Sequence, residues 1–267
     1  MRKLFAAALT SVLALAHTSA FAETDASVRD IVKKAELASY YAGDDGRTEA
    51  RMLIVDAQGR KQTRQFTILR RDRADGGEQD LMVFFSRPAD VRDTVFRVIK
   101  RTDADDDRWL YLPGLDLVKR ISAGDKRTSF VGSNFFYEDV SGRNTELDDF
   151  QLVEETDSLY RLGATPKDPS SVEFSRYVVE IDKTTFIPMQ IEFFDSQDRL
   201  YRKVQALKVE TIQGYPTVTY SRIEDLLNGG ATEMQFRHIK YNLGLPEDIF
   251  SERSLRTPPR QWLELGQ

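Results

Sequence analysis

Apolar and polar residues alternate along much of the chain, and this pattern predicts an antiparallel β-sheet. Alternating apolar and polar side chains place one face of a strand on the core and the other in water. Short turn-forming segments separate the alternating stretches, and Asn228-Gly229-Gly230 is the strongest hairpin signal among them. Strands separated by such short turns are typical of a meander rather than of βαβ units. The clearest predicted strands are residues 47–56, 187–193, 200–209, 217–226 and 232–241.

One helix is predicted near the start of the chain, over Ser27–Ala42. Apolar residues between Val28 and Ala38 recur at helical spacing, Ser27 and Asp30 form a plausible capping pair, and Gly43 supplies a stop. The apolar stripe of this helix needs a partner, and the sheet that follows is the candidate.

Two other segments have a predicted place. Leu81–Phe85 is apolar on both faces, so we expect a central strand that is covered on each side. The Pro88–Asp93 loop, which interrupts the pairing, is expected to help cover the concave face. Pro258 and Pro259 near the end predict a tail that lies on the surface.

The stretch Asp105–Val140 combines a short apolar strand, a basic segment and a group of aromatic residues. Its aromatics are interrupted by Gly132, Ser133 and Asn134. Aromatic residues spaced by turn formers do not share one helix stripe or one strand face. They therefore predict a bent, aromatic-rich wall, which is either ordinary core or the lining of a cavity for an apolar ligand.

Three runs in this part of the chain carry a resemblance to a known family. FFSRPADVRDTVFRV (residues 84–98), RWLYLPGLDLVKRI (108–121) and SFVGSNFFYEDV (129–140) resemble the LolA-like family of outer-membrane lipoprotein-sorting proteins. The resemblance extends from about Ala26 to about Leu255, and none of its motifs is a catalytic signature. It implies a mainly β fold, namely an unclosed antiparallel β half-barrel whose helices cover a hydrophobic cavity. It also implies a periplasmic carrier of lipid or lipoprotein, of a kind that often accompanies exporters of the RND superfamily.

The first 22 residues are typical of a cleavable signal peptide. Arg2 and Lys3 precede an apolar segment, and Ala20-Phe21-Ala22 is a small-x-small cleavage site. We therefore expect a single domain over residues 23–267 that is exported to the periplasm. The chain has no cysteine, which excludes disulfides and lipid attachment through an N-terminal cysteine. The mature protein is expected to touch membranes only transiently.

Charge argues against nucleic acid as a partner. The whole chain has a formal charge of −5, and without Arg2 and Lys3 the 36 Lys and Arg residues face 43 Asp and Glu residues, which gives −7. Nucleic-acid binders normally carry a basic excess.

Candidate catalytic chemistry is sparse, so the protein is not expected to be an enzyme or to need a cofactor or metal. His238 is the one histidine beyond the signal segment, and no G-x-S-x-G motif is present. The usual His/Cys ligands of zinc are missing. The acidic run 103–107 fails as a calcium loop because Arg108 and Gly114 stand where glycine and glutamate are required.

Two sets of residues are predicted to contact a ligand or partner. A basic cluster is expected either to meet anionic headgroups or an acidic partner, or to be an ordinary solvated loop; it consists of Lys119, Arg120, Lys126 and Arg127. The predicted lipid-binding lining consists of Phe84, Phe96, Trp109, Tyr111, Phe130, Phe135, Phe136, Met189, Phe193 and Phe236.

These features predict a carrier that binds lipid or lipoprotein acyl chains and hands them between envelope components without catalysis. Each buried methylene contributes about 0.8 kcal/mol, so complete burial of several chains would trap the cargo. An open half-barrel avoids this because it covers its ligand incompletely. Two alternatives stay open: an accessory of an RND-type exporter that binds a hydrophobic small molecule or docks to the transporter, and a sensor of misfolded envelope proteins, which would normally add a second domain.

Overall fold

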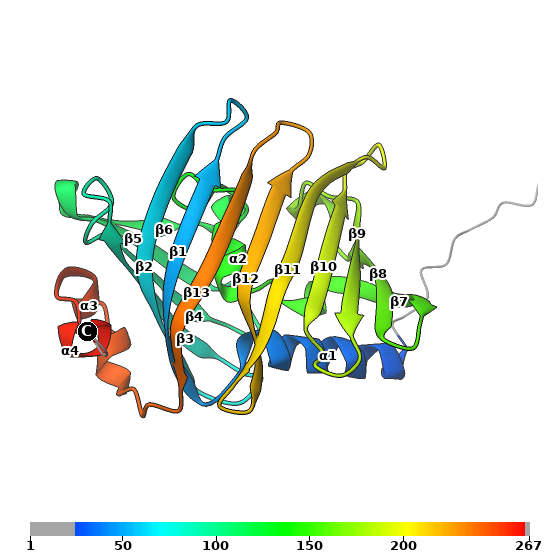
Figure 1. Ribbon diagram of the computed structural model, residues 1–267, viewed down its shortest axis with the longest axis horizontal. Coiled ribbons are helices and arrows are strands. Elements are labelled where there is room, and N and C mark those ends of the chain that lie inside the picture. The colour runs from blue at the N-terminus through cyan, green and yellow to red at the C-terminus, as the bar shows by residue number, and fades with distance from the viewer. Residues whose placement is uncertain (1–24, 265–267) are drawn as a thin grey trace, which may run out of the picture.

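The structure, a computed structural model, describes residues 25–264, which form one thirteen-stranded antiparallel sheet with few helices (Figure 1). The predicted signal segment, residues 1–22, lies outside the described residues. The helices are α1 (Ala26–Tyr40), α2 (Tyr137–Ser141), α3 (Arg253–Arg256) and α4 (Arg260–Leu263). The strands are β1 (Asp45–Val55), β2 (Lys61–Asp72), β3 (Gln79–Arg87), β4 (Val95–Lys100), β5 (Asp107–Leu112), β6 (Leu117–Ile121), β7 (Asp148–Glu155), β8 (Leu159–Pro166), β9 (Arg176–Asp182), β10 (Pro188–Phe194), β11 (Leu200–Ile212), β12 (Tyr215–Asp225) and β13 (Ala231–Tyr241).

The sheet is an antiparallel meander that stays open between two strands from the middle of the sequence. Its order is β6-β5-β4-β3-β2-β1-β13-β12-β11-β10-β9-β8-β7, so the first and last strands pair with each other while β6 and β7 are the two edges. The open side therefore falls between β6 and β7, and residues 122–147 connect these strands. This arrangement confirms the predicted unclosed antiparallel half-barrel.

The predicted hairpin at Asn228-Gly229-Gly230 is confirmed as the connection between β12 and β13. Gly230 has a φ of 98°, and a Cβ atom there would lie 2.9 Å from the Val55 carbonyl oxygen. Glycine is required at this turn because any side chain would both strain the backbone and clash with β1.

The concave face of strands β1–β5 is filled by the protein itself. Residues 122–147 fold back onto this face and contribute Phe130 and Tyr137 to a core cluster with Phe85 and Phe96. Val91, from the Pro88–Asp93 loop, packs against the same cluster. The aromatic residues on the concave face of this half of the sheet therefore form a close-packed core.

Helix α1 covers the concave face at the other end of the sheet. Its buried residues Val28, Val32 and Ala35 belong to a second cluster with aromatic and aliphatic side chains of β7–β10. The helix begins one residue earlier than predicted because Asp25 is the N-cap, and its side chain accepts a hydrogen bond from the Ser27 backbone N–H at 2.7 Å.

The C-terminal segment covers the convex face of β2–β4 (Figure 1). Leu245, Phe250 and Leu255 are buried there against Met82 and Phe84 in a third cluster. The segment from Leu245 to Leu255 therefore supplies core, whereas residues 258–264 are half-buried or exposed, which agrees with the predicted surface tail. The prediction that Leu81–Phe85 is covered on both faces is confirmed, because alternate residues of β3 belong to the first and third clusters.

Candidate functional site: a cavity beneath helix α1

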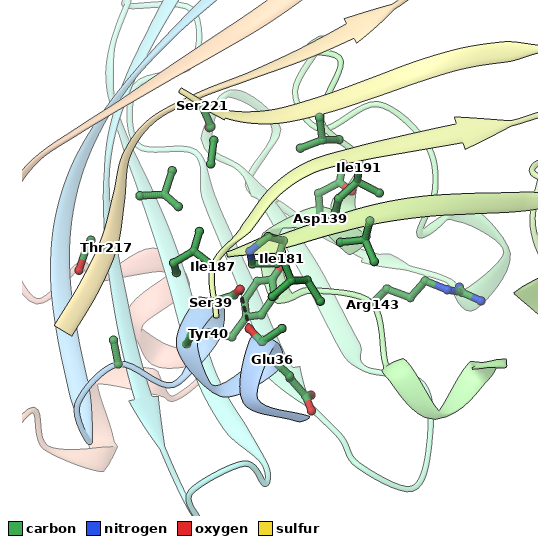
Figure 2. A pocket seen from close by; sticks show the side chains of 18 of the residues that line it. Glu36, Ser39, Tyr40, Asp139, Arg143, Ile181, Ile187, Ile191, Thr217 and Ser221 are labelled. Atoms are coloured by element: carbon green, nitrogen blue, oxygen red, sulfur yellow. Dashed lines mark hydrogen bonds between the residues drawn. The ribbon is translucent and has the colours of Figure 1, made fainter. Parts of the chain in front are cut away.

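A cavity of about 430 Å³ lies between helix α1 and the concave face of strands β9–β13 (Figure 2). Pockets for small molecules usually have volumes of about 300–1,000 Å³, so this one is large enough for a ligand. A smaller hollow of about 140 Å³ adjoins it and shares Tyr40, Thr48 and Ile68 with its wall. The aliphatic part of the larger cavity is lined by Ile181, Ile187, Ile191, Val204, Val218 and Ile239.

The register of the strands explains why these side chains share one wall. Ile191 pairs with Val179 on one side and with Val204 on the other, which places three aliphatic residues in a row across β9, β10 and β11. From the helix, Ala35 and Ala38 line the cavity and contribute only a methyl group each. Helix α1 therefore lies over the strands without filling the space beneath it.

The C-terminal end of α1 is fixed by side chains of β2 and β3. Arg70 donates hydrogen bonds to the carbonyl oxygens of Tyr40, Ala42 and Gly43, and Gln79 donates to the Tyr40 carbonyl at 2.8 Å. The last carbonyls of a helix lack intrahelical partners, so these bonds satisfy groups that would otherwise need water. These bonds fix the C-terminal end of α1, the helix that covers the cavity.

A buried network of ion pairs closes the side of the cavity that faces residues 122–147. Its centre is Glu138, which is 3 % exposed and lies 2.6 Å from Arg127, 3.4 Å from Arg143 and 3.9 Å from Lys126. Arg143 also forms a bidentate pair with Asp148, at 2.8 Å for both bonds. Buried charges are tolerated only when they are paired and hydrogen-bonded in this way.

Asp139, which also lines the cavity, is held by a second buried cation. Its Oδ2 atom accepts hydrogen bonds from the Phe136 backbone N–H at 2.6 Å and from Arg202 at 2.5 Å. The Arg202 guanidinium lies 4.4 Å from the ring centre of Phe136 and 5.2 Å from that of Phe193. Its Nε and Nη1 atoms have no hydrogen-bond partner in the described chain, and its charge is balanced by Asp139 and the two rings.

Tyr40 forms the end of the cavity between α1 and the segment after α2 (Figure 2). Its ring packs so closely on Gly142 that a Cβ atom built there would lie 2.6 Å from Tyr40 Cζ. Burial raises the pKa of the Tyr40 hydroxyl, and the negative charges of Asp139, Glu36 and Glu138 raise it further.

We expect Gly142→Ala to lower the free energy of unfolding by about 2–3 kcal/mol, measured by urea denaturation. Gly142 has a φ of 79°, which strains an alanine, and the added methyl group also collides with the Tyr40 ring. Gly214→Ala is the matched control because its φ is 89° but no atom of residues 25–264 lies within 4 Å of the new Cβ. Its expected loss is about 1 kcal/mol, and an equal loss in both variants would show that the Tyr40 contact is unimportant.

Two of the ten aromatic and methionine residues predicted to line a cavity do so, namely Phe193 and Phe236. Phe96 and Phe130 are buried in the first cluster, and Phe135 packs against it. Phe84 and Tyr111 belong to the third cluster on the convex face.

The remaining three predicted residues lie outside the lining as well. The Arg97 guanidinium stacks on Trp109, 4.8 Å from its ring centre, and Phe136 lies against both Arg127 and Arg202. Met189 falls at an irregularity in the pairing of β10 with β9, between Pro188 and Gln190, which shifts the phase of the strand.

The predicted basic cluster is divided between two environments. Lys119 and Arg120 are exposed on edge strand β6, whereas Lys126 and Arg127 are buried in ion pairs. Arg127 lines the cavity and lies 2.6 Å from Glu173 as well as from Glu138. The four residues therefore do not form one surface patch.

The sequence-based prediction missed most of the cavity wall, including the side chains of β9. Tyr177, Val179 and Ile181 line the cavity, and they alternate with residues of the other face. That alternation is a signal that would have identified this strand. His238 lies on β13 with its side chain 64 % exposed, and its Nδ1 atom is 2.9 Å from Glu49.

Residues 25–264 contain no helix that is long and apolar enough to cross a membrane. They also contain no group of three or more His, Cys, Asp or Glu side chains arranged to hold a metal ion.

Comparison with known proteins identifies the family. A family model described as "Uncharacterized protein" matches residues 77–257, and no curated protein matches the chain. A DUF1329 family protein from Desulfovibrio piger is 31 % identical, with a TM-score of 0.77 over 85 % of this chain and 96 % of that one. A putative outer membrane lipoprotein-sorting protein domain from Vibrio parahaemolyticus is 26 % identical, with a TM-score of 0.77 over 85 % and 97 %.

A LolA superfamily protein from Nitrosomonas europaea shares the fold, at 21 % identity and a TM-score of 0.63 over 84 % of this chain and 97 % of that one. The predicted resemblance to LolA-like proteins is thereby confirmed. The chain belongs to the DUF1329 family and has the LolA-like fold.

Proposed function

We propose that this protein is a periplasmic carrier that binds lipid, or an acyl chain of a lipoprotein, in the cavity beneath α1 and releases it without chemical change. The observation that carries the proposal is the open, mainly aliphatic cavity of about 430 Å³ in a protein with the LolA-like fold. The similarity to a putative lipoprotein-sorting domain supports the same class of cargo.

The volume of the cavity favours one acyl chain rather than several. Its volume falls in the lower half of the range usual for ligand pockets. At about 0.8 kcal/mol for each buried methylene, part of one acyl chain already gives useful affinity. An incompletely covered chain can leave again, as a carrier requires. Residues 1–22, which are typical of a signal peptide, support export to the periplasm.

The proposal is tested by filling the cavity. Ile191→Trp adds bulk to the row formed with Val179 and Val204, so we expect binding of the fluorescent apolar probe N-phenyl-1-naphthylamine to weaken at least about tenfold. Leu152→Trp is the matched control, because Leu152 lies on edge strand β7 with 43 % exposure. Native mass spectrometry of both variants and of the parent protein should find co-purified lipid in the parent and the control alone.

Two results would contradict the proposal. A parent protein that contains no lipid and binds no probe would favour a docking role, such as the accessory of an RND-type exporter. Equal probe binding by the Ile191→Trp and Leu152→Trp variants would place the ligand outside the cavity beneath α1.

A further inference from the structure

One end of the cavity is polar. The positively charged side chains that line the cavity already form ion pairs with carboxylates of the protein. Among the described lining residues the positively charged ones are Arg127 and Arg143. Arg127 is held between Glu138 and Glu173, at 2.6 Å from each, and its side chain is 8 % exposed. Arg143 is bound bidentately by Asp148 and lies 3.4 Å from Glu138. Neither guanidinium is free to bind an anionic ligand.

The Arg202 guanidinium is not available to bind an anionic ligand in the cavity either. Its side chain is 4 % exposed and is absent from the cavity lining, and it contacts Asp139 and two aromatic rings. Its effect on the cavity is to position Asp139.

Asp139 presents an oxygen atom that can accept a hydrogen bond from a ligand. Both of the hydrogen bonds to its carboxylate end on Oδ2, and within residues 25–264 no partner binds Oδ1. The side chain is 21 % exposed and lines the cavity. A carboxylate oxygen in such a partly dry site gains from a donor and repels a second anion.

The Tyr40 hydroxyl is the second unused polar group at this end. Its ring packs on Gly142 and beneath Lys100, whose Nζ atom lies 5.0 Å from the ring centre, but the hydroxyl has no hydrogen-bond partner in the described part of the chain. Tyr40 is half-buried and lines the cavity, so a ligand there can exchange a hydrogen bond with this hydroxyl. The raised pKa of Tyr40, caused by burial and then by Asp139, Glu36 and Glu138, agrees with a negative environment.

We propose that the ligand is a single-chain amphiphile whose head is a hydroxyl or an ammonium group bound at Asp139 and Tyr40, and that free carboxylates and phosphates are disfavoured. The inference rests on the carrier function proposed above. The aliphatic wall takes the chain, while the polar end selects a head that donates hydrogen bonds and bears no negative charge.

The test compares three ligands with the same chain and different heads. 1-Hexadecanol, hexadecylamine and palmitate compete with N-phenyl-1-naphthylamine for the purified protein at neutral pH. We expect hexadecanol and hexadecylamine to displace the probe at concentrations at least about tenfold lower than palmitate. Palmitate displacing the probe as well as hexadecanol would overturn the inference, while probe binding itself would leave the carrier function standing. Failure of the probe to bind would instead count against the carrier function.

Two variants test whether Asp139 and Tyr40 cause the preference for hydroxyl and ammonium heads over carboxylates. Asp139→Asn leaves Arg202 without a counter-charge, so palmitate binding should strengthen about tenfold, whereas Asp157→Asn at an exposed position should change nothing. Tyr40→Phe should weaken hexadecanol binding about three- to tenfold and leave the melting temperature unchanged, because the hydroxyl has no hydrogen-bond partner among residues 25–264. If Asp139→Asn does not fold, the assigned site is tested by comparing hexadecanol and palmitate binding in Tyr40→Phe. Unchanged selectivity in Tyr40→Phe would then refute the assigned site.

Discussion

Replacing Phe130 by alanine is expected to lower the free energy of unfolding by about 3–5 kcal/mol and to leave ligand binding intact. Phe130 is 2 % exposed, and its ring centre lies 5.3 Å from that of Phe96, 5.6 Å from that of Tyr137 and 5.8 Å from that of Phe85. Its removal leaves a void in a close-packed cluster and ends these ring contacts. Urea denaturation gives the stability, and probe titration at low temperature gives the affinity.

Phe236→Ala makes the same chemical change in the cavity wall and should give the opposite result. Phe236 is only partly buried and lines the cavity. We expect a smaller loss of stability than for Phe130→Ala, together with weaker binding of N-phenyl-1-naphthylamine. If Phe130→Ala instead weakened binding while the protein stayed folded, the aromatic wall over residues 130–137 would be the ligand site.

Glu138→Gln is expected to lower the free energy of unfolding by about 3 kcal/mol. The substitution keeps the size of the side chain but removes the negative charge shared by Arg127, Arg143 and Lys126. Loss of one partner from a buried ion pair usually costs about 3–5 kcal/mol. We expect the lower end of this range because each of the three cations keeps another carboxylate, at Glu173, Asp148 and Asp105.

The control for this variant is Glu146→Gln, in the same connection between β6 and β7. Glu146 is exposed, so its unfolding free energy should change by less than about 0.5 kcal/mol. Urea denaturation of both variants provides the comparison. Similar losses in the two would mean that the buried network adds nothing specific to stability.

The alternation of residues was sufficient to predict the class of sheet and several of its strands. Strands β10–β13 carry clear turn signals between them, and the helix over α1 has both a stop and helical spacing. The pairing of β1 with β13 was not predicted, because pairing between strands far apart in the sequence leaves no local signal. The C-terminal cover was missed for a related reason, since its apolar residues between Leu245 and Leu255 follow neither strand nor helix spacing for long.

The candidate site was harder to predict because strand phase decides which side chains face inward. Leu110 faces the concave side, so Trp109 and Tyr111 fall on the convex side although all three belong to one apolar run. An irregularity beside Met189 reverses the phase of β10 in the same way. Aromatic content also misled the prediction, because the cavity is lined mainly by aliphatic residues while most of the aromatics fill the core.

Ion-pair partners could not be predicted from the order of residues. Arg127 lies 46 positions from Glu173, and nothing in the basic segment distinguishes it from the exposed Arg120. A cluster of cations in a sequence therefore indicates neither exposure nor a shared direction. Only the folding of residues 122–147 onto the sheet separates the buried pair from the exposed pair.

The open side of the sheet leaves two strands, β6 and β7, each with one row of backbone groups that pairs with no strand of this sheet. The unpaired backbone N–H and C=O groups of an edge strand can pair with an edge strand of another molecule, which leads to aggregation. Lys119 and Arg120 stand exposed on β6, and Glu154 and Glu155 stand exposed on β7. Like charges would be brought together by β6-to-β6 or β7-to-β7 contact, so these residues oppose pairing between identical edges of two molecules. Charged side chains on both edges thus limit aggregation in a sheet that does not close.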